Sequence, residues 1–418
     1  MIKIIDVKGR QVFDSRGNPT IEAEIYLDNG KSESAIAPSG ASTGAFEAHE
    51  LRDEDQSKFL GKSVYKAVEN INKKIKPSLK GCDPNDQLKV DKILIELDDT
   101  KNKTNLGANS MLAVSLANAK CSAKSKNLSL YKNLGNEFSI PNPLMNIING
   151  GAHADNDLKI QEFMIRPDSS INFMDAIEKC FLVIQNLKKI LISKKMLTNV
   201  GDEGGFAPSI SSNEDALELI VDSIEKSKLK PGKDIVICLD VAANELINKE
   251  GEYSIKSNNF YNADEIISYY ETITNKYPIK SIEDPFAEED WESWKKITNK
   301  IGKNIQIVGD DLFVTNEKRL SKGIKESSAN SILVKPNQIG TLTETLKVIN
   351  LAKKNNFKTI ISHRSGDSED TFIADLAVAT MSSQIKTGSL ARSERVAKYN
   401  RLIRVEEELG NLVKMARV

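Results

Sequence analysis

The sequence predicts an α/β protein: a (β/α)8-type barrel with an irregular ββαα start, preceded by a smaller α+β domain. Short apolar runs recur in the second half of the chain, each followed by a helix-length segment, which is the rhythm of a parallel sheet. Each run ends at a polar residue. These residues are Asp240, Glu283, Asp310, Lys335 and His363. Strands followed by helices precede this rhythm, and they predict the separate first domain.

The first domain is predicted to span residues 1–137. Residues 4–37 resemble a small meander, because Ile21, Ala23, Ile25 and Leu27 alternate with polar neighbours. Residues 63–134 carry apolar residues at helical spacing. The prolines near residue 141 mark a junction, so the barrel is assigned to residues 138–418.

The barrel is predicted to open irregularly. Residues 144–148 and 160–165 are both strand-like, and the gap between them is too short for a crossover helix. These two strands should therefore be antiparallel. Helices over 173–194 and 213–228 are expected before the strand at 235–239 begins the βα units.

Composition bounds the class of protein. The chain has 418 residues, of which 39% are hydrophobic and 28% charged, with a formal net charge of −1. These values are typical of a soluble globular protein and argue against a generally nucleic-acid-binding surface. No apolar run approaches the ~20 residues that span a bilayer, and the start lacks a signal-peptide pattern. Four dispersed cysteines indicate reduced thiols, and we expect a cytoplasmic protein without a membrane span.

The polar strand ends predict a metal site. In a parallel barrel every carboxyl end of a strand lies at the same face, so Asp240, Glu283, Asp310, Lys335 and His363 should converge on one mouth. Three carboxylates so close together repel one another unless a cation lies among them. Hard oxygen ligands of this kind suit Mg²⁺.

Two glycine-rich segments admit two interpretations each. The loop at residues 37–45 is either a plain connector or a lid that adds Ser42 to a bound ion on closure. It lacks the lysine of a phosphate-binding P-loop. The segment 199–206 is either an ordinary turn or a loop that carries Glu203 close to a ligand.

Ten segments, in order along nearly the whole chain, resemble the enolase family. They are FDSRGNPT, APSGASTG, INGGAHADN, QEFMIRP, NVGDEGGFAP, SIEDPFAEEDW, VGDDLFVTN, KPNQIGT, SHRSGDSED and GSLARSERVAKYNRLIRVEEELG. The resemblance implies the dehydration of 2-phosphoglycerate to phosphoenolpyruvate with two Mg²⁺ ions. It also implies a homodimer or a larger homo-oligomer.

The resemblance implies a role for each matching residue. Lys335 matches the general base and Glu203 the general acid. Carboxylates matching those that hold the first Mg²⁺ are Asp240, Glu283 and Asp310, and Ser42 matches the lid residue of the second. Substrate-side positions are His153, Gln161 and Glu162 near the acid, His363, Arg364 and Ser365 near the phosphate, and Lys398 at the substrate carboxylate.

The base Lys335 is expected to have a lowered pKa, because nearby cations, the metal ions and Lys398, favour its neutral form. Two rivals are another metal-dependent enolising enzyme of this architecture, such as an acid-sugar dehydratase, and a catalytically inactive structural or binding relative. This sequence differs from the usual family pattern at four positions: His49, Asn244, Phe313 and Glu317.

Overall fold

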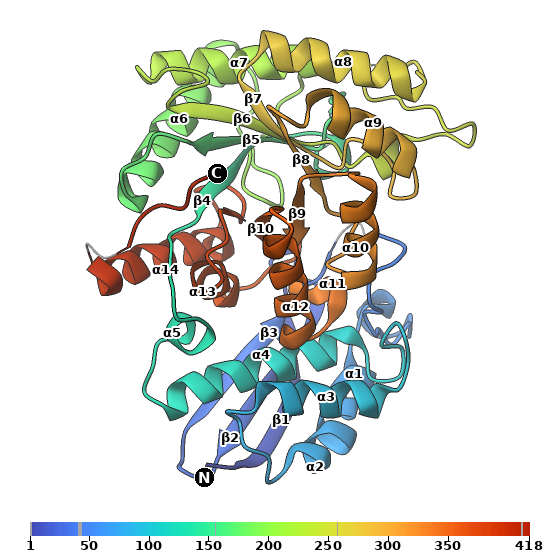
Figure 1. Ribbon diagram of the computed structural model, residues 1–418, viewed down its shortest axis with the longest axis vertical. Coiled ribbons are helices and arrows are strands. Elements are labelled where there is room, and N and C mark those ends of the chain that lie inside the picture. The colour runs from blue at the N-terminus through green and yellow to red at the C-terminus, as the bar shows by residue number, and fades with distance from the viewer. Residues whose placement is uncertain (1, 41–43, 155, 257, 411–412) are drawn as a thin grey trace.

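The computed structural model describes residues 2–40, 44–154, 156–256, 258–410 and 413–418. The chain forms a three-stranded sheet with helices on one side, followed by a closed eight-stranded barrel with helices around it (Figure 1). The predicted fold class is confirmed. The predicted boundary at residue 137 falls between α5 (Leu130–Leu134) and β4 (Asn142–Asn149).

The N-terminal sheet is an antiparallel meander in the order β1-β2-β3. Its strands are β1 (Ile4–Phe13), β2 (Pro19–Leu27) and β3 (Ser32–Ala37). On β2 the apolar residues Ile21, Ala23, Ile25 and Leu27 are buried and alternate with half-exposed residues, as the sequence pattern predicts.

Helices cover the buried face of this sheet. Those in contact with its strands are α1 (Tyr65–Asn70), the π-helical turn η2 (Ile71–Ile75), α2 (Lys76–Leu79) and α4 (Ala108–Ser125). The short 3₁₀ helix η1 (Phe59–Gly61) precedes α1, and both α3 (Gln87–Asp98) and α5 pack on α4. Helix α4 is buried on nearly every side, because it lies between the sheet and barrel helices α11 and α12 (Figure 1). Its small residues permit that close packing.

The barrel closes in the order β10-β11-β4-β5-β6-β7-β8-β9. The strands after β4 are β5 (Glu162–Pro167), β6 (Ile235–Asp240), β7 (Ile279–Glu283), β8 (Gln306–Gly309), β9 (Ser331–Val334), β10 (Lys358–Ser362) and β11 (Gln384–Lys386). Strand β5 pairs antiparallel with β4 and β6, and the other barrel pairs are parallel. The predicted irregular opening is thus confirmed.

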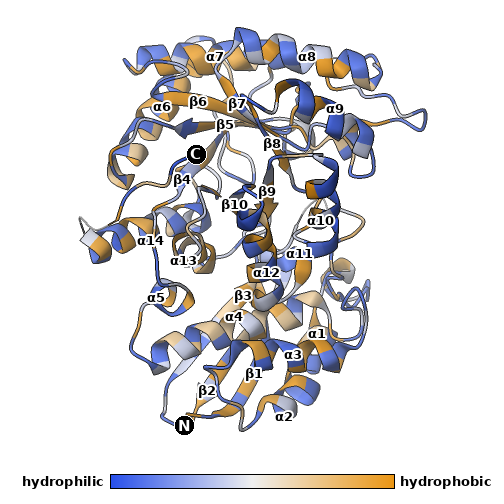
Figure 2. Cartoon of the chain, in the orientation of Figure 1, coloured by the Kyte–Doolittle hydropathy of each residue, from blue (hydrophilic) through white to orange (hydrophobic). Residues whose placement is uncertain are grey.

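Amphipathic helices surround the barrel and turn their apolar faces towards it (Figure 2). They are α6 (Phe173–Ser193), α7 (Asn213–Lys226), α8 (Ala263–Lys276), α9 (Trp291–Ile301), α10 (Glu317–Glu326), α11 (Pro336–Ile339), α12 (Leu342–Lys354), α13 (Phe372–Ala379) and α14 (Ser393–Leu409), with 3₁₀ turns η3 (Gly151–His153) and η4 (Ala243–Leu246). Within the described residues, none of these helices is long and apolar enough to cross a membrane.

The barrel interior is built in layers because strand side chains alternate between its two faces. The middle layer is apolar and consists of Leu144, Met164, Val236, Cys238, Val308, Leu333 and Ile360. Polar side chains stand two residues further towards the carboxyl rim on five strands, after Leu144, Cys238, Val308, Leu333 and Ile360; Asp240 follows Cys238 and Lys335 follows Leu333 in this way. Strand β5 runs the other way, so it presents its first residue, Glu162, at that rim. The fold therefore gathers these charges by strand periodicity alone.

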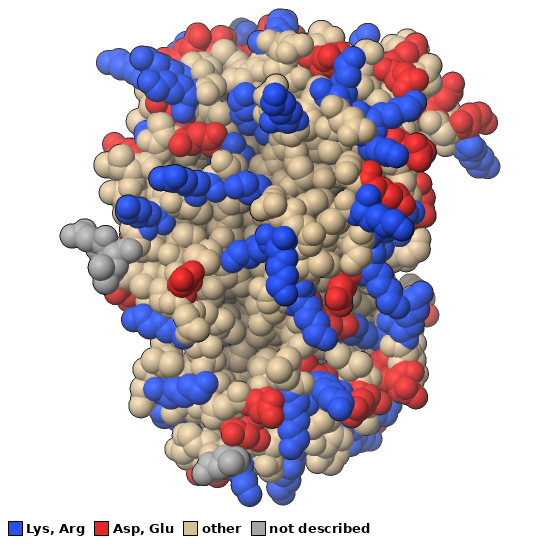
Figure 3. All heavy atoms as spheres, in the orientation of Figure 1, with Lys and Arg blue, Asp and Glu red and all other residues tan. Residues whose placement is uncertain are grey.

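Charged side chains of both signs are interspersed on the molecular face shown in Figure 3. The four cysteines are free thiols, as predicted.

Candidate active site

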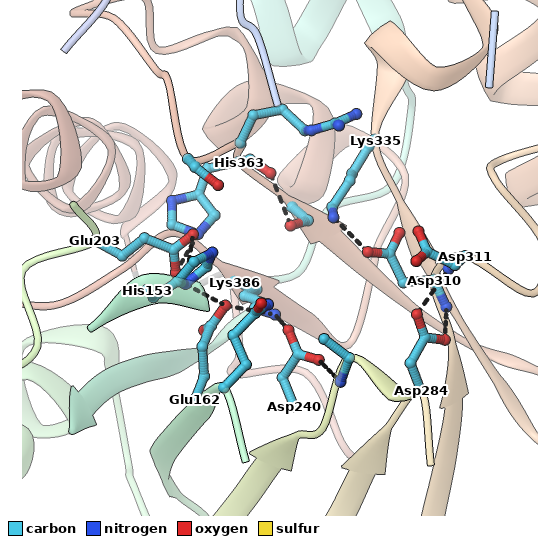
Figure 4. Close-up of a pocket in the computed structure, with 15 residues that line it drawn as sticks. His153, Glu162, Glu203, Asp240, Asp284, Asp310, Asp311, Lys335, His363 and Lys386 are labelled. Atoms are coloured by element: carbon cyan, nitrogen blue, oxygen red, sulfur yellow. Dashed lines mark hydrogen bonds and ion pairs between the residues drawn. The ribbon is translucent and has the colours of Figure 1, made fainter. Parts of the chain in front are cut away.

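A polar pocket lies at the carboxyl rim of the barrel (Figure 4). It brings together most of the residues named from the sequence: His153, Gln161, Glu162, Glu203, Asp240, Asp310, Lys335, His363, Arg364 and Ser365. Glu283 reaches the same rim, where it pairs with Lys386. Ser42 lies outside the described residues. The convergence predicted from the strand ends is confirmed.

Three carboxylates converge on the Lys386 ammonium. Its Nζ lies 2.7 Å from Asp240 Oδ2, 2.8 Å from Glu283 Oε1 and 3.2 Å from Glu162 Oε1. Lys386 ends β11, so it obeys the same strand-end rule as the predicted residues. Burial alone would lower the pKa of this lysine, but the surrounding carboxylates outweigh it and raise the pKa well above its usual value.

Asp310 stands at the centre of a second acidic group. Its Oδ2 forms an ion pair with Lys335 Nζ. The neighbouring Asp284 accepts hydrogen bonds from the backbone N–H groups of Asp310 and Asp311, each at 2.9 Å. Asp284 adopts a left-handed backbone conformation, with φ of 42°. Its carboxylate thus fixes the chain that carries Asp310 after β8.

The acidic groups fit a divalent cation. Among the described residues, ligand atoms of Asp284, Asp310 and Asp311 lie within 4.8 Å of one another. The ligand atoms of the predicted trio Asp240, Glu283 and Asp310 do not form such a group among the described residues; Lys386 pairs with Asp240 and Glu283, and Lys335 pairs with Asp310. Burial, together with the neighbouring carboxylates, raises the pKa of Glu283 well above its usual range and that of Asp311 to about 7. Ionising several such carboxylates side by side is costly without a cation, and their oxygens form a donor set suited to Mg²⁺.

The opposite side of the pocket holds a second pair of carboxylates with two histidines (Figure 4). His153 Nδ1 lies 3.8 Å from Glu162 Oε1 and 3.9 Å from Glu203 Oε1. His363 Nε2 lies 3.4 Å from Glu203 Oε2. Glu162 Oε2, Gln161 Oε1 and His153 Nδ1 are buried without a hydrogen-bond partner, which leaves polar atoms for a ligand.

Glycine permits Glu203 to reach this place. Gly204 has φ of +85°, and a Cβ there would lie 2.8 Å from the carbonyl oxygen of Ala391. A Cβ on Gly205 would lie 2.7 Å from Asn149 Oδ1. The loop at 199–206 therefore carries its carboxylate into the pocket by close backbone approach, the second of the two interpretations drawn from the sequence.

One proton is shared unequally by the two glutamates. Burial and the charge of Glu203 raise the pKa of Glu162 well above its usual range. For Glu203, burial alone would raise the pKa, but His363, His153 and Lys386 outweigh it and lower the pKa well below its usual range. Burial lowers the pKa of His363 to about 4, so this histidine is neutral at pH 7. The protein groups thus place the proton on Glu162, whereas the sequence assigned it to Glu203.

The protein groups also hold Lys335 as an ammonium. Burial alone would lower its pKa, but the Asp310 carboxylate outweighs burial and raises it. The cations that oppose this effect are Arg364 and Lys386, not Lys398 as expected. A lowered pKa at Lys335 therefore requires charge that the protein itself does not supply, and it stays a prediction.

Arg364 is held rigidly at the edge of the pocket. Its Nη1 donates to Glu47 Oε2 at 2.9 Å and to Asn337 Oδ1 at 3.1 Å, and its Nη2 donates to Glu47 Oε1 at 3.2 Å. The backbone of Gly40 lies against it, since a Cβ there would be 1.9 Å from Arg364 Nη2. The guanidinium is 3% exposed, a planar donor at the edge of the pocket.

The structure does not bring Lys398 to this pocket, and the assignment of that residue is corrected. Lys398 is buried on α14, and its Nζ contacts Asp367 Oδ1 at 2.5 Å, Ser368 O at 2.6 Å and Glu394 O at 2.9 Å. All three donor positions are taken, so none is left for a substrate. The lysine in the pocket is Lys386.

Sequence reasoning missed three charged residues of the pocket: Lys386, Asp284 and Asp311. The strand-end rule could have found Lys386, because it follows Ile385 as Lys335 follows Val334. Asp284 and Asp311 each stand directly after a predicted carboxylate. Asn244, a departure from the family pattern, donates to Asp311 Oδ2 at 2.8 Å.

Known proteins match this chain along nearly its whole length. Residues 4–134 match the family model of the enolase N-terminal domain, and residues 137–417 match that of the enolase C-terminal TIM barrel domain. A curated enolase of Pelagibacter ubique (strain HTCC1062) is 61% identical over 420 residues, which cover 100% of both chains.

Proposed function

Because this chain belongs to the enolase family, and is therefore a lyase of the phosphopyruvate hydratase type, we propose that it reversibly dehydrates 2-phosphoglycerate to phosphoenolpyruvate in glycolysis and gluconeogenesis with magnesium. The observation that carries this proposal is the opposition of two groups across one pocket. Lys335 lies on one side and the Glu203–Glu162 pair on the other, with buried carboxylates between them (Figure 4). An elimination needs a base and an acid placed in this way.

The carboxylates assigned to magnesium are Asp240, Glu283 and Asp310, with Asp284 and Asp311 beside Asp310 and Ser42 as the expected ligand of a second ion. Bound there, magnesium would act as a Lewis acid that stabilises the extra negative charge on the substrate carboxylate. Its charge would also offset that of Asp310 and lower the pKa of Lys335.

Lys335 is the proposed base that takes the proton from C2. Lys386 takes over the role first given to Lys398, and its ammonium faces the carboxylate of the substrate. Arg364, fixed by Glu47, presents its guanidinium to the phosphate at the edge of the pocket, with Ser365 and His363 beside it.

The acid side is proposed to work as a unit. Glu203 lies nearest the two histidines and delivers the proton to the hydroxyl that leaves C3. Glu162 holds that proton before the reaction, and His153 lies between the two carboxylates at 3.8 and 3.9 Å. Gln161 borders Glu162 in the pocket.

An assay of phosphoenolpyruvate formation with and without EDTA tests the proposal. We expect turnover of 2-phosphoglycerate that EDTA abolishes and added Mg²⁺ restores. Turnover of an acid sugar but not of 2-phosphoglycerate would favour the other enolising class, and no turnover of either would favour an inactive relative. A homodimer and a cytoplasmic location are proposed from the family resemblance.

A further inference from the structure

Gln338 contacts both Asp310 in the pocket and Glu47, the residue that holds Arg364. It lies on α11, just after β9, and is 1% exposed. Its Nε2 donates to Asp310 Oδ1 at 2.8 Å and lies 3.4 Å from Glu47 Oε1. Its Oε1 accepts from Thr315 Oγ1 at 2.8 Å. The amide thus uses both ends, and its orientation is fixed by these partners.

Two partners of Gln338, Asp310 and Thr315, also contact the proposed base Lys335. Asp310 uses Oδ1 for Gln338 and Oδ2 for Lys335, so the amide sets which oxygen faces the lysine. Thr315 Oγ1 also accepts from the backbone N–H of Lys335 at 2.9 Å. The chain that carries the base and the carboxylate beside it are therefore tied to the same amide.

The second connection runs to the phosphate side. The backbone carbonyl of Gln338 accepts from Ala48 N–H at 2.8 Å, which holds the segment that carries Glu47. Both carboxylate oxygens of Glu47 in turn accept hydrogen bonds from Arg364. Gln338 thus holds Glu47 through its side chain and through the neighbouring backbone.

We propose that Gln338 is a positioning residue that orients Asp310 towards the cation and fixes Glu47, and through it Arg364, towards the phosphate. The inference rests on the proposed function and adds a residue to it. Residues that orient metal-binding carboxylates in this way contribute about 10–100-fold to metal affinity or activity.

A merely structural role for a buried amide is the rival, and a matched control separates the two. Gln384 is also fully buried in the barrel, at its opposite end. Its amide donates to Gln306 Oε1 at 3.1 Å and accepts from Arg166 Nη1 at 2.9 Å. Gln384→Met removes a buried amide of the same kind without touching the pocket.

The test compares full-length wild type, Gln338→Met and Gln384→Met. Binding of Mg²⁺ is measured by titration calorimetry without substrate, KM and kcat with 2-phosphoglycerate, and stability by urea unfolding. Gln338→Met should weaken Mg²⁺ binding about 10–100-fold and raise KM. Gln384→Met should lower the free energy of unfolding. Its Mg²⁺ affinity and KM should stay within about twofold of the wild-type values, because a distant, independent site leaves them unchanged to about that precision.

A second variant keeps the test open should Gln338→Met fail to fold. Thr315→Val removes the hydroxyl that orients the Gln338 amide and that also accepts from the backbone N–H of Lys335, and a smaller loss of Mg²⁺ affinity is expected. Mg²⁺ binding and KM unchanged in the Gln338 variant, or equal losses in both glutamine variants, would overturn the inference. Wild type that neither binds Mg²⁺ nor turns over 2-phosphoglycerate would instead refute the proposed function.

Discussion

Replacing Lys398 by methionine distinguishes a structural lysine from a substrate-binding one. Lys398 is fully buried and forms an ion pair with Asp367, itself 5% exposed. Methionine fills a similar volume but leaves the Asp367 carboxylate without its partner, together with two carbonyl oxygens that lose their donor. Removing one partner of a buried pair costs about 3–5 kcal/mol, so we expect the free energy of unfolding at pH 7 to fall by that amount.

The pH dependence of this loss follows from the pKa of Asp367. Burial alone would raise that pKa, but Lys398 outweighs burial and lowers it below 3.8. In wild type the pair therefore contributes stability at pH above the unfolded value of about 3.9, and this is lost as pH falls through the folded pKa. In Lys398→Met we expect the pKa of Asp367 to rise, because burial remains while the largest of the effects that lower it is lost. The stability that the carboxylate contributes above about pH 4 should then be reduced.

Urea unfolding of wild type and Lys398→Met at several pH values between about 4 and 7 measures this effect. The gap between the two should widen towards pH 7, by about 1.4 kcal/mol for each unit by which the Asp367 pKa moves. The control is the double variant Asp367→Asn, Lys398→Met, which removes both charges and should recover at least half of the loss. KM for 2-phosphoglycerate should stay within about threefold of wild type in the folded variant, on the order of 0.6 kcal/mol. Unchanged stability with a KM raised tenfold or more would refute the reasoning and return Lys398 to the substrate.

Three further substitutions follow from the geometry. Lys386→Met should reduce kcat/KM by at least about 100-fold, since the ammonium among three carboxylates is lost; steady-state activity near wild type would contradict its place in the site. Gly40→Ala should raise KM about tenfold, ~1.4 kcal/mol, because the added carbon would lie 1.9 Å from Arg364 Nη2; an unchanged KM would show that Arg364 does not need this position. Phe313→Thr should lower the free energy of unfolding by about 3 kcal/mol, because a buried ring beside Trp291 is removed; a KM shifted as strongly as stability would contradict its role as packing alone.

The barrel and its rim were predictable because one rule covers nearly every strand. An apolar run followed by a charged residue gives both the strand and its functional end, as for Asp240 after Leu239 and Lys335 after Val334. The reversal of β5 was predictable too, because chain length between two strands is a hard geometric limit.

The remainder of the site depends on contacts that sequence spacing does not encode. Lys398 and Lys386 are both lysines near a motif, and only the packing of α14 shows that Lys398 is committed to Asp367. The raised pKa of Glu162 depends on its burial and on the charge of Glu203, which together outweigh the ammonium of Lys386 at 3.2 Å. Gln338 gives no chemical signal in the sequence, since an amide becomes a positioning group only through its partners.

The departure at Phe313 has a packing explanation. A Cβ on Gly309 or Gly323 would lie 2.6 or 2.4 Å from the Phe313 ring, so two glycines make room for it. The ring contacts Trp291 and Phe357 at centroid distances of 6.5 and 6.2 Å. Gly309 and Gly323 thus leave room for the larger ring near the site.

Exchange of the C2 proton of 2-phosphoglycerate in deuterated buffer, followed by NMR with saturating Mg²⁺, tests the separation of base and acid most directly. Glu203→Gln should lose dehydration and keep exchange, because Lys335 remains, whereas Lys335→Ala should lose both. Exchange near the wild-type rate in Lys335→Ala, or its loss in Glu203→Gln together with dehydration, would contradict a lysine base acting opposite a separate carboxylic acid.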